Sequence, residues 1–273
     1  MRAAPALALA FALGCAHEPV AVAPKGPAPR QEPPSPAAPQ ALKGSGPALA
    51  SQAESRFRSE DYAGAIELLK RAINATPALA ALDPGRRLGR LERLFDEIEL
   101  RSDDRRALFS REAGPAGLAA SDAIVAYVEG RDVEAVLLAS AAVGEDPQTQ
   151  SIRLLLAAIS KGTGLDALHE QLLPRAALVQ HKLQRAEKAF FDKRFGEAAR
   201  ECQEAVWLDP RSAPAWTRLG SARWASGEPE KAREAYERAL AIDPKNAEVR
   251  LFLESKGLLG RGRPAARQEI KSQ

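Results

Sequence analysis

The sequence of 273 residues is poor in the residue types that commonly build disulfide-rich, metal-binding or β-rich proteins. It has two cysteines, three histidines and one methionine, and only 5% of its residues are aromatic. Cys15 and Cys202 are too few and too differently placed to form a disulfide framework. The shortage of aromatic residues, with Ala, Leu, Arg and Glu dominant, argues against a β-rich core and favours helices.

The sequence also lacks an excess of charge of one sign. Lysine and arginine number 39 and aspartate and glutamate 36, which gives a formal net charge of +3 at pH 7. A chain this close to neutral offers no general case for nucleic-acid binding, so no nucleic-acid partner is expected.

No catalytic or metal-binding constellation is found. His17, His169 and His181 lack the spacing of metal ligands. Cys202 lies four residues after Ala198, which places it on the packing face of a helix as a buried, inert thiol. No glycine-rich phosphate loop follows a strand. We therefore expect no catalytic residue, no metal, no cofactor and no enzymatic activity.

The longest apolar run lies at the N-terminus. Residues 1–14 carry one positive charge at Arg2, followed by an apolar stretch. As a helix this stretch reaches only roughly 18 Å, whereas a bilayer core is about 30 Å thick. It therefore predicts a signal peptide and not a transmembrane anchor. The run ends in Ala12-Leu13-Gly14-Cys15, which resembles a bacterial lipobox, where the cysteine becomes the acylated N-terminus.

Lipid on Cys15 would attach the protein to the membrane. Because Ala16 and not Asp follows the cysteine, the resemblance implies the periplasmic side of the bacterial outer membrane. The alternative is ordinary cleavage, for instance after Ala23, which would leave a soluble periplasmic or secreted protein. Residues 15–48 are rich in Pro and Ala without apolar periodicity, so we expect a disordered, extended linker.

After residue 48, one pattern occurs four times: an alanine, a second alanine seven residues later, and a proline five residues after that. The copies are Ala65, Ala72, Pro77; Ala135, Ala142, Pro147; Ala198, Ala205, Pro210; and Ala232, Ala239, Pro244. Alanines seven residues apart share one helix face and let a neighbouring helix approach closely. We expect the proline to stop one helix and start the next.

The last two copies are 34 residues apart, a period typical of stacked helix hairpins. Residues 213–246 resemble the tetratricopeptide repeat (TPR) family, with Trp216 and Gly220 in the first helix and Tyr236 in the second. The resemblance implies an all-α, right-handed TPR-like α-solenoid of antiparallel helix hairpins, preceded by the signal peptide and the Pro/Ala-rich linker.

The preceding copy departs from the family pattern. Residues 179–212 match in the second helix, but Lys182 and Arg185 replace the aromatic residue and the leucine expected in the first. The four hairpins are expected at about 49–78, 116–147, 179–212 and 213–246, within a helical domain spanning 49–259, before a basic tail at 260–273.

Two segments between the hairpins do not carry the repeat. Residues 79–115 contain an amphipathic helix, whose apolar stripe is Leu88, Leu91, Leu94, Phe95 and Ile98. Ser102 would cap another helix. Residues 151–173 predict a degenerate helix pair that turns at residues 162–164.

In the TPR family, function means binding of peptides or partner helices, mainly by the first helix of each hairpin. The resemblance points here to Phe190, Phe191 and Trp224 near the ends of first helices, with Arg218 and Arg223 nearby. Packing uses most aromatic residues, so Phe190 and Trp224 could equally fill the seams between hairpins.

Two functions remain open at this point. The first is a non-enzymatic, lipid-anchored scaffold that recruits or assembles other envelope proteins. The second is a regulatory TPR arm or subunit of an envelope enzyme, with activity in residues 79–115. A cleft of polar groups in that segment would favour the second, and the apolar stripe favours the first.

The lipobox resemblance generates the first prediction. Replacing Cys15 with Ser should release the protein from the membrane fraction, because the acylated thiol is lost. Fractionation of cells followed by immunoblotting measures this. A Cys15→Ser protein that stays membrane-bound with normally processed signal would show that the lipobox interpretation is wrong.

Overall fold

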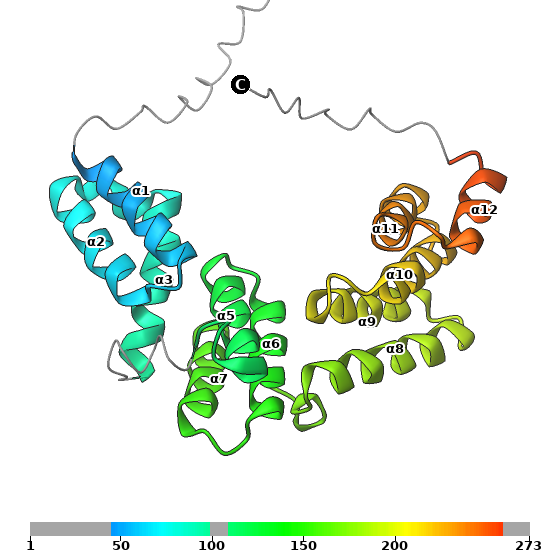
Figure 1. Ribbon diagram of the computed structural model, residues 1–273, viewed down its shortest axis with the longest axis horizontal. Helices are drawn as coiled ribbons and strands as arrows, with labels where there is room; N and C mark the ends of the chain where they lie inside the picture. The colour runs from blue at the N-terminus through cyan, green and yellow to red at the C-terminus, as the bar shows by residue number, and fades with distance from the viewer. Residues whose placement is uncertain (1–44, 99–108, 259–273) are drawn as a thin grey trace, which may run out of the picture. The chain divides into compact units, whose positions relative to one another are not determined.

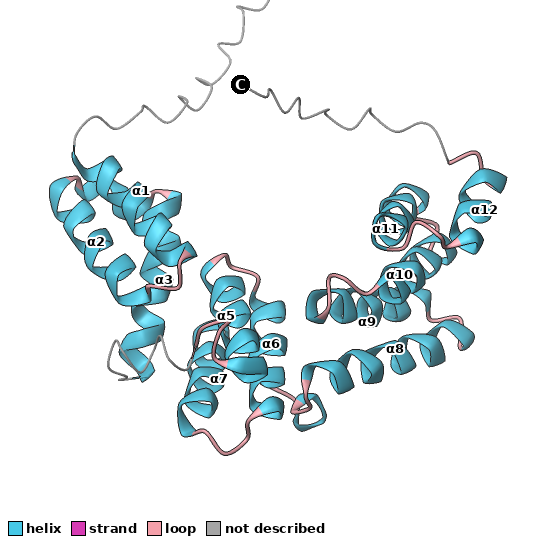
Figure 2. Ribbon diagram, in the orientation of Figure 1, coloured by secondary structure: helices cyan, strands magenta, loops and turns pink. Residues whose placement is uncertain are grey.

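The computed structural model describes residues 45–98 and 109–258, and every regular element in them is a helix. The described part contains eleven α-helices. Figures 1 and 2 show them joined by loops, with no strand among the described residues. The all-α prediction is thereby confirmed for these residues. The signal peptide, Cys15, most of the linker, the helix expected after Ser102 and the basic tail lie outside them.

Four pairs of consecutive helices pack as antiparallel hairpins. They are α1 (Ser45–Arg58) with α2 (Tyr62–Ala75), α5 (Gly114–Val128) with α6 (Asp132–Glu145), α8 (Arg175–Phe191) with α9 (Phe195–Leu208), and α10 (Ala213–Ala225) with α11 (Pro229–Ile242). Helix α1 begins before residue 49, within the stretch expected to be linker. Each hairpin turn contains one residue with positive φ: Glu60, Gly130, Lys193 and Gly227.

All eight alanines of the repeated pattern are buried, with exposed fractions of 0–1%. The two helices of each pair approach closely, because the only side-chain group between their backbones at these positions is a methyl group. Gly220 shows how tight such contacts are, since a Cβ placed on it would lie 2.7 Å from ring atoms of Tyr236. We call the contact surface between neighbouring helices a seam. At Gly220 the seam has no room for a larger side chain.

The repeated prolines do not begin α-helices, contrary to expectation. After Pro147, Pro210 and Pro244 the next helices begin at α7 (Gln150–Thr163), at α10 and at α12 (Ala247–Ser255). Only Pro77 opens a helix, the short 3-10 helix η1 (Pro77–Ala81). In the other three copies the proline carbonyl accepts a hydrogen bond from a side chain six residues later, of Arg153, Trp216 or Arg250. The proline thus shapes the connection between hairpins.

The amphipathic helix of the first irregular segment is α3 (Asp83–Ile98), and its predicted apolar stripe is buried throughout. Tyr62 at the start of α2 packs against Phe95 of this helix, with ring centroids 5.4 Å apart. Phe95 in turn lies 6.1 Å from Phe109. Aromatic packing of this kind joins the first hairpin to α3 and to the residues that lead into α5.

Residues 151–173 form one α-helix and not the expected pair. Helix α7 ends at Gly164, which has a φ of +71°, and only the 3-10 helix η2 (His169–Gln171) comes after it in this segment. Gly164 turns the chain out of α7 with its positive φ, and Pro174 disfavours helical geometry at Leu173. The backbone of Leu173 crosses α6 where Gly144 leaves space for it.

The two departures from the TPR pattern in α8, the buried Lys182 and the partly exposed Arg185, are both charged and both paired. The ammonium of Lys182, whose side chain is 4% exposed, lies 3.3 Å from Glu201 and 2.5 Å from Glu204 of α9. Arg185 donates to the other oxygen of Glu201 at 2.9 Å and to Glu170 of η2 at 2.6 Å. Ion pairs thus replace apolar packing between α8 and α9.

Helix α12 contacts α11 and ends the array in the described residues. Val249 and Leu253 are its buried side chains, and Asn246 caps its first turn by accepting from the amide of Val249. Among the described helices, none combines the length and the apolar character needed to cross a membrane.

Overpacking of the seams generates the second prediction. Ala205→Leu and Ala232→Leu should each lower the free energy of unfolding by about 1–3 kcal/mol, because both alanines are fully buried and the larger side chain must be forced between closely packed helices. Ala241 lies on α11 and is exposed, so Ala241→Leu is the matched control. Denaturant midpoints that do not differ among the three variants would contradict this assignment of the seams.

The buried ion pairs generate the third prediction. Lys182→Met should lower the free energy of unfolding by about 3 kcal/mol, because Glu204 and one oxygen of Glu201 lose their buried counter-charge. Lys188 on the same helix is exposed, and Lys188→Met should change stability little. Chemical denaturation of the two variants measures the difference, and equal midpoints would show that the pair is energetically unimportant.

Candidate functional site

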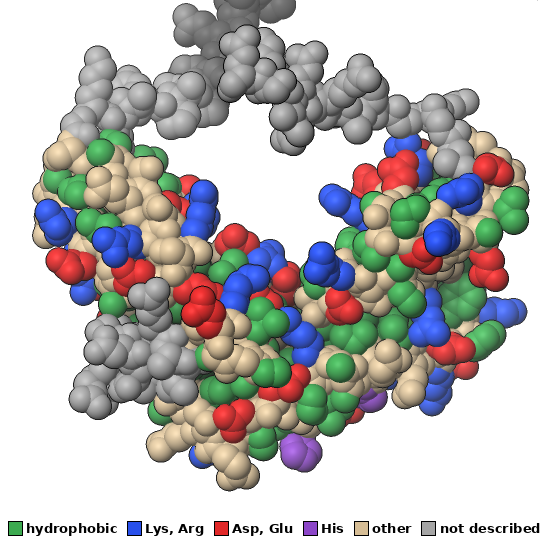
Figure 3. All heavy atoms as spheres, viewed as in Figure 1, with side chains coloured by type: hydrophobic (Ala, Val, Ile, Leu, Met, Phe, Trp, Pro, Cys, Tyr) green, Lys and Arg blue, Asp and Glu red, His purple; other side chains and the backbone are tan. Residues whose placement is uncertain are grey.

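A small apolar cleft opens between α8, α9 and α10. It has a volume of about 220 Å³. We call it the apolar cleft and define it by its lining residues Ala186, Glu187, Phe190, Phe191, Ala198, Cys202, Arg218, Ser221 and Ala222. Figure 3 shows apolar side chains exposed over these helices among charged side chains of both signs.

The floor of the apolar cleft consists of small buried side chains. Ala186, Ala198, Cys202 and Ala222 are each exposed by only 1–2%. They lie there because α8, α9 and α10 pack closely at these positions, as contacts between each pair of helices show. Burial raises the pKa of the Cys202 thiol to about 12, so at neutral pH it is a protonated apolar wall and not a nucleophile.

Two phenylalanines form one wall. Phe191 has 75% of its surface exposed, which is unusual for a large apolar side chain. Phe190 lies partly buried beside it, with ring centroids 6.4 Å apart, and also packs against Phe195 at 5.2 Å. An exposed ring beside an apolar cleft is the kind of feature that marks a binding surface.

Charged groups stand at the rim. A guanidinium nitrogen of Arg218 lies 3.9 Å from a carboxylate oxygen of Glu187, and the two side chains are 45% and 52% exposed. In the described part of the chain, Arg218 donates no hydrogen bond, and no other carboxylate lies within ion-pair distance of it. A pair this loose and exposed contributes little stability, so Arg218 can bind another acidic group.

The structure brings three of the five sequence-predicted binding residues together. Phe190, Phe191 and Arg218 all line the apolar cleft. Sequence reasoning did not identify the small residues of its floor as part of a site. The sequence analysis took Cys202 only for a buried thiol. Cys202 occupies the position that Tyr236 has in the next copy, 34 residues later, and this loss of a ring is the signal that could have revealed the cleft.

The other two predicted residues lie elsewhere. Trp224 packs edge-on against Phe252 of α12 at a centroid distance of 5.2 Å, and the ammonium of Lys256 lies 5.6 Å from its ring. Arg223 donates to the side chain of Gln203 at 2.8 Å and to the carbonyl of Lys231 at 3.3 Å. Both residues therefore hold neighbouring helices together.

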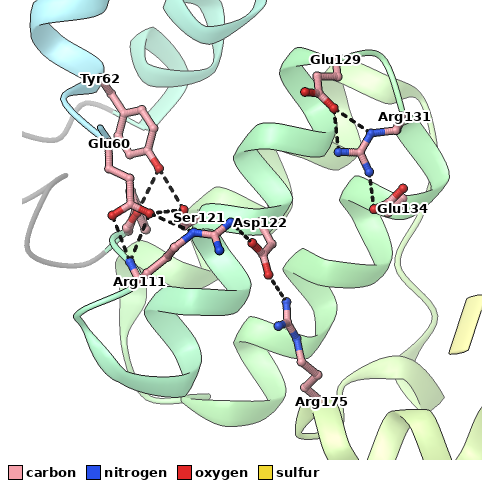
Figure 4. Close-up of polar contacts among 10 residues, drawn as sticks. Glu60, Tyr62, Arg111, Ser121, Asp122, Glu129, Arg131, Glu134 and Arg175 are labelled. Carbon is pink, nitrogen blue, oxygen red and sulfur yellow. Dashed lines mark hydrogen bonds and ion pairs between the residues drawn. The ribbon is translucent and has the colours of Figure 1, made fainter. Parts of the chain in front are cut away.

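A larger cleft of about 900 Å³ lies where α5, α6 and α8 meet the connection from α9 to α10. Its lining is mixed: charged side chains alternate with apolar ones such as Leu138, Val179 and Trp207. Figure 4 shows how the charges in and beside it connect hairpins. Arg111 reaches Asp122 at 2.7 Å, and Asp122 also accepts from Arg175 of α8 at 2.7 Å.

The same network extends to the first hairpin. Glu60 accepts the backbone amide of Arg111 and, at 2.6 Å, the hydroxyl of Ser121. The hydroxyl of Tyr62 lies 3.3 Å from Ser121 and donates to the carbonyl of Phe109 at 3.1 Å, and burial raises its pKa. Because these charges already pair with one another, we infer that the residues around the larger cleft serve to join the hairpins.

No metal site is found in the described part of the chain: it contains no group of three or more His, Cys, Asp or Glu residues placed to hold an ion. The buried stripe of α3 leaves Arg90, Arg93 and Glu97 at the surface, beside Tyr127 and Lys161. Their charges are used locally, since Arg90 lies over the ring of Tyr127 at 4.2 Å and Glu97 accepts from Lys161 at 2.7 Å.

Comparison with known proteins gives two matches. Residues 213–253 match the family model of the tetratricopeptide repeat. The chain is also 38% identical over 55 residues to small glutamine-rich tetratricopeptide repeat-containing protein 2 of Saccharomyces cerevisiae. That similarity covers 20% of this chain and 16% of the yeast protein, so it concerns the repeat and not the whole protein.

These matches cover the most regular part of the array. The chain contains a tetratricopeptide repeat, and the helices before it pack as hairpins of the same kind. Repeats of this kind indicate a role in protein–protein interaction.

Proposed function

We propose that this protein is a non-enzymatic interaction scaffold, attached by lipid on Cys15 to the periplasmic side of a bacterial outer membrane. There it recruits or assembles other envelope proteins. The observation that carries the binding role is the apolar cleft with its exposed Phe191, set in the regular C-terminal hairpins beside the tetratricopeptide repeat. The apolar N-terminal run that ends at Cys15 supports the lipid anchor.

The bound segment is a peptide or helix of an envelope protein that lies across residues 179–246. Rigid, well-packed helices lose little conformational freedom on binding, so they bind with a smaller ordering cost than mobile loops. Phe191 supplies exposed apolar area, and the guanidinium of Arg218 supplies charged hydrogen-bond donors. An apolar contact combined with one charged contact makes the surface selective for its partner.

The alternative, a regulatory arm of an envelope enzyme with activity in residues 79–115, has less support. Leu88, Leu91, Leu94, Phe95 and Ile98 are 0–3% exposed, so α3 uses its apolar stripe to pack into the core. This is the arrangement of an element that closes gaps between hairpins.

The binding role generates the fourth prediction. Phe191→Ala and Arg218→Ala should each weaken partner binding without lowering the melting temperature, because both side chains are largely exposed. Trp224→Ala should lower the melting temperature, because the ring packs against Phe252 in the seam to α12. Co-purification from detergent-solubilised envelopes, together with thermal melts, measures both effects.

The matched control for charge is Arg238→Ala. Arg238 is exposed on α11 and does not line the apolar cleft, so its loss should leave binding unchanged. Partner binding that survives Phe191→Ala and Arg218→Ala in folded protein would move the site away from residues 179–246.

A further inference from the structure

The apolar cleft has a counterpart in the next hairpin, because α8–α9 and α10–α11 repeat at an interval of 34 residues. The position of Cys202 in α9 corresponds to Tyr236 in α11, and the position of Ala186 in α8 corresponds to Gly220 in α10. The chain therefore shows the same seam twice with different side chains.

In the second seam, aromatic rings fill the space. Tyr236 packs on Gly220 so closely that a Cβ there would touch its ring, and its hydroxyl lies 3.0 Å from that of Ser221. The ring centroid of Phe252 lies 5.1 Å from Tyr236 and 5.2 Å from Trp224. Rings from three successive helices thus occupy this seam at the distances that aromatic pairs prefer.

In the seam of the apolar cleft, two of these three rings are missing. Cys202 stands in place of Tyr236 and Arg218 in place of Phe252, while Phe190 keeps the aromatic position of Trp224. The small thiol cannot reach across the space that a phenol ring fills, and Arg218 extends to the rim. The cleft of about 220 Å³ is what these two replacements leave.

The first two hairpins carry other side chains at these positions, with Leu69 and Ala139 in place of Cys202. An aromatic residue lies eight positions before the first motif alanine in all four hairpins: Phe57, Tyr127, Phe190 and Trp224. The position that corresponds to Arg218 is Gly85 of α3 after the first hairpin and the fully buried Leu155 of α7 after the second. Within these hairpins, the only charged residue at that position is Arg218.

We infer that the apolar cleft is a vacant aromatic slot that receives an aromatic side chain of the partner, with a carboxylate of the partner on Arg218. This inference rests on the proposed binding role and specifies its chemistry. The floor of alanines and thiol and the wall of Phe190 enclose the space that rings fill in the second seam, but the methyl group of Ala186 stands where that seam has Gly220. A phenyl ring of the partner therefore enters from the rim, at the position that corresponds to Phe252, and not at the position of the Tyr236 ring.

The charge at the rim determines which group accompanies the ring. Arg218 has unused hydrogen-bond donors, and its one ion-pair partner, Glu187, is 3.9 Å away and half exposed. A carboxylate can therefore form charge-assisted hydrogen bonds that Glu187 does not make. The partner segment carries an aspartate, a glutamate or a C-terminal carboxylate close to its aromatic residue.

The test uses 3-phenylpropionate as the probe and the full chain with ¹³C-labelled alanine methyl groups. Ala186, Ala198 and Ala222 line the slot, so entry of a ring should shift their NMR signals by its ring current. Ala232 and Ala239 belong to the filled seam and should not shift. The amide 3-phenylpropanamide should bind about two- to fivefold more weakly, because it lacks the charge that pairs with Arg218.

Plugged variants make the test specific. Cys202→Phe combined with Ala186→Gly places a ring in the slot from within, as Tyr236 and Gly220 do in the second seam, so it should abolish the shifts of Ala198 and Ala222. Cys202→Ala leaves the slot open and should bind the probe as the natural protein does. Because Cys202→Phe is in the core and could overpack it, Arg218→Phe, at the exposed rim, provides a second plug that imitates Phe252.

The slot is refuted if 3-phenylpropionate leaves the three alanine methyl groups unshifted, or if both plugged variants still bind it. Tighter binding of phenethylamine than of 3-phenylpropionate would overturn the assignment of a carboxylate to Arg218. A partner that co-purifies equally with natural and plugged proteins would overturn the slot and leave the scaffold intact. Probe binding without any envelope partner would overturn the scaffold and leave the slot.

Discussion

The close approach of paired helices at buried alanines is the constraint on which the rest of this structure depends. Each motif alanine lies where two helices meet, and its exposed fraction is at most 1%. Because the backbones are held so near one another, the side chains around each alanine must together match a fixed space. The differences among the hairpins are therefore different ways of filling the same seam.

Charge can replace apolar packing in this framework, provided that every buried charge has a partner. Lys182 stands where a TPR has an aromatic residue, and its ammonium lies between Glu201 and Glu204. The network of Glu60, Ser121, Asp122 and Arg175 likewise joins consecutive hairpins. Removing Lys182 would leave Glu204 and one oxygen of Glu201 without their counter-charge, so this pairing specifies which helices meet more than it adds stability.

Periodic features could be predicted from the sequence, and features set by contacts between distant residues could not. The spacing of alanines placed four hairpins, and the stripe of Leu88, Leu91 and Leu94 placed α3, because both follow helical periodicity. The missing second helix after α7 depends on the turn at Gly164 and on Pro174. Phe190 and Trp224 occupy the same position of the repeat, so the sequence alone does not distinguish them. In the structure Phe190 lines the apolar cleft, whereas Trp224 packs against Phe252.

The position of the open seam also has a physical reason. Hairpin α8–α9 contacts α6 on one side and α10 on the other, so its fold is supported from both directions. Hairpin α10–α11 has only α12 beyond it in the described residues, a helix of 9 residues. Next to so short a helix, the seam of α10–α11 is packed by aromatic rings, those of Tyr236, Phe252 and Trp224. An inner hairpin can leave its seam unfilled and keep its fold, which makes α8–α10 the place where a partner's side chain can complete the packing.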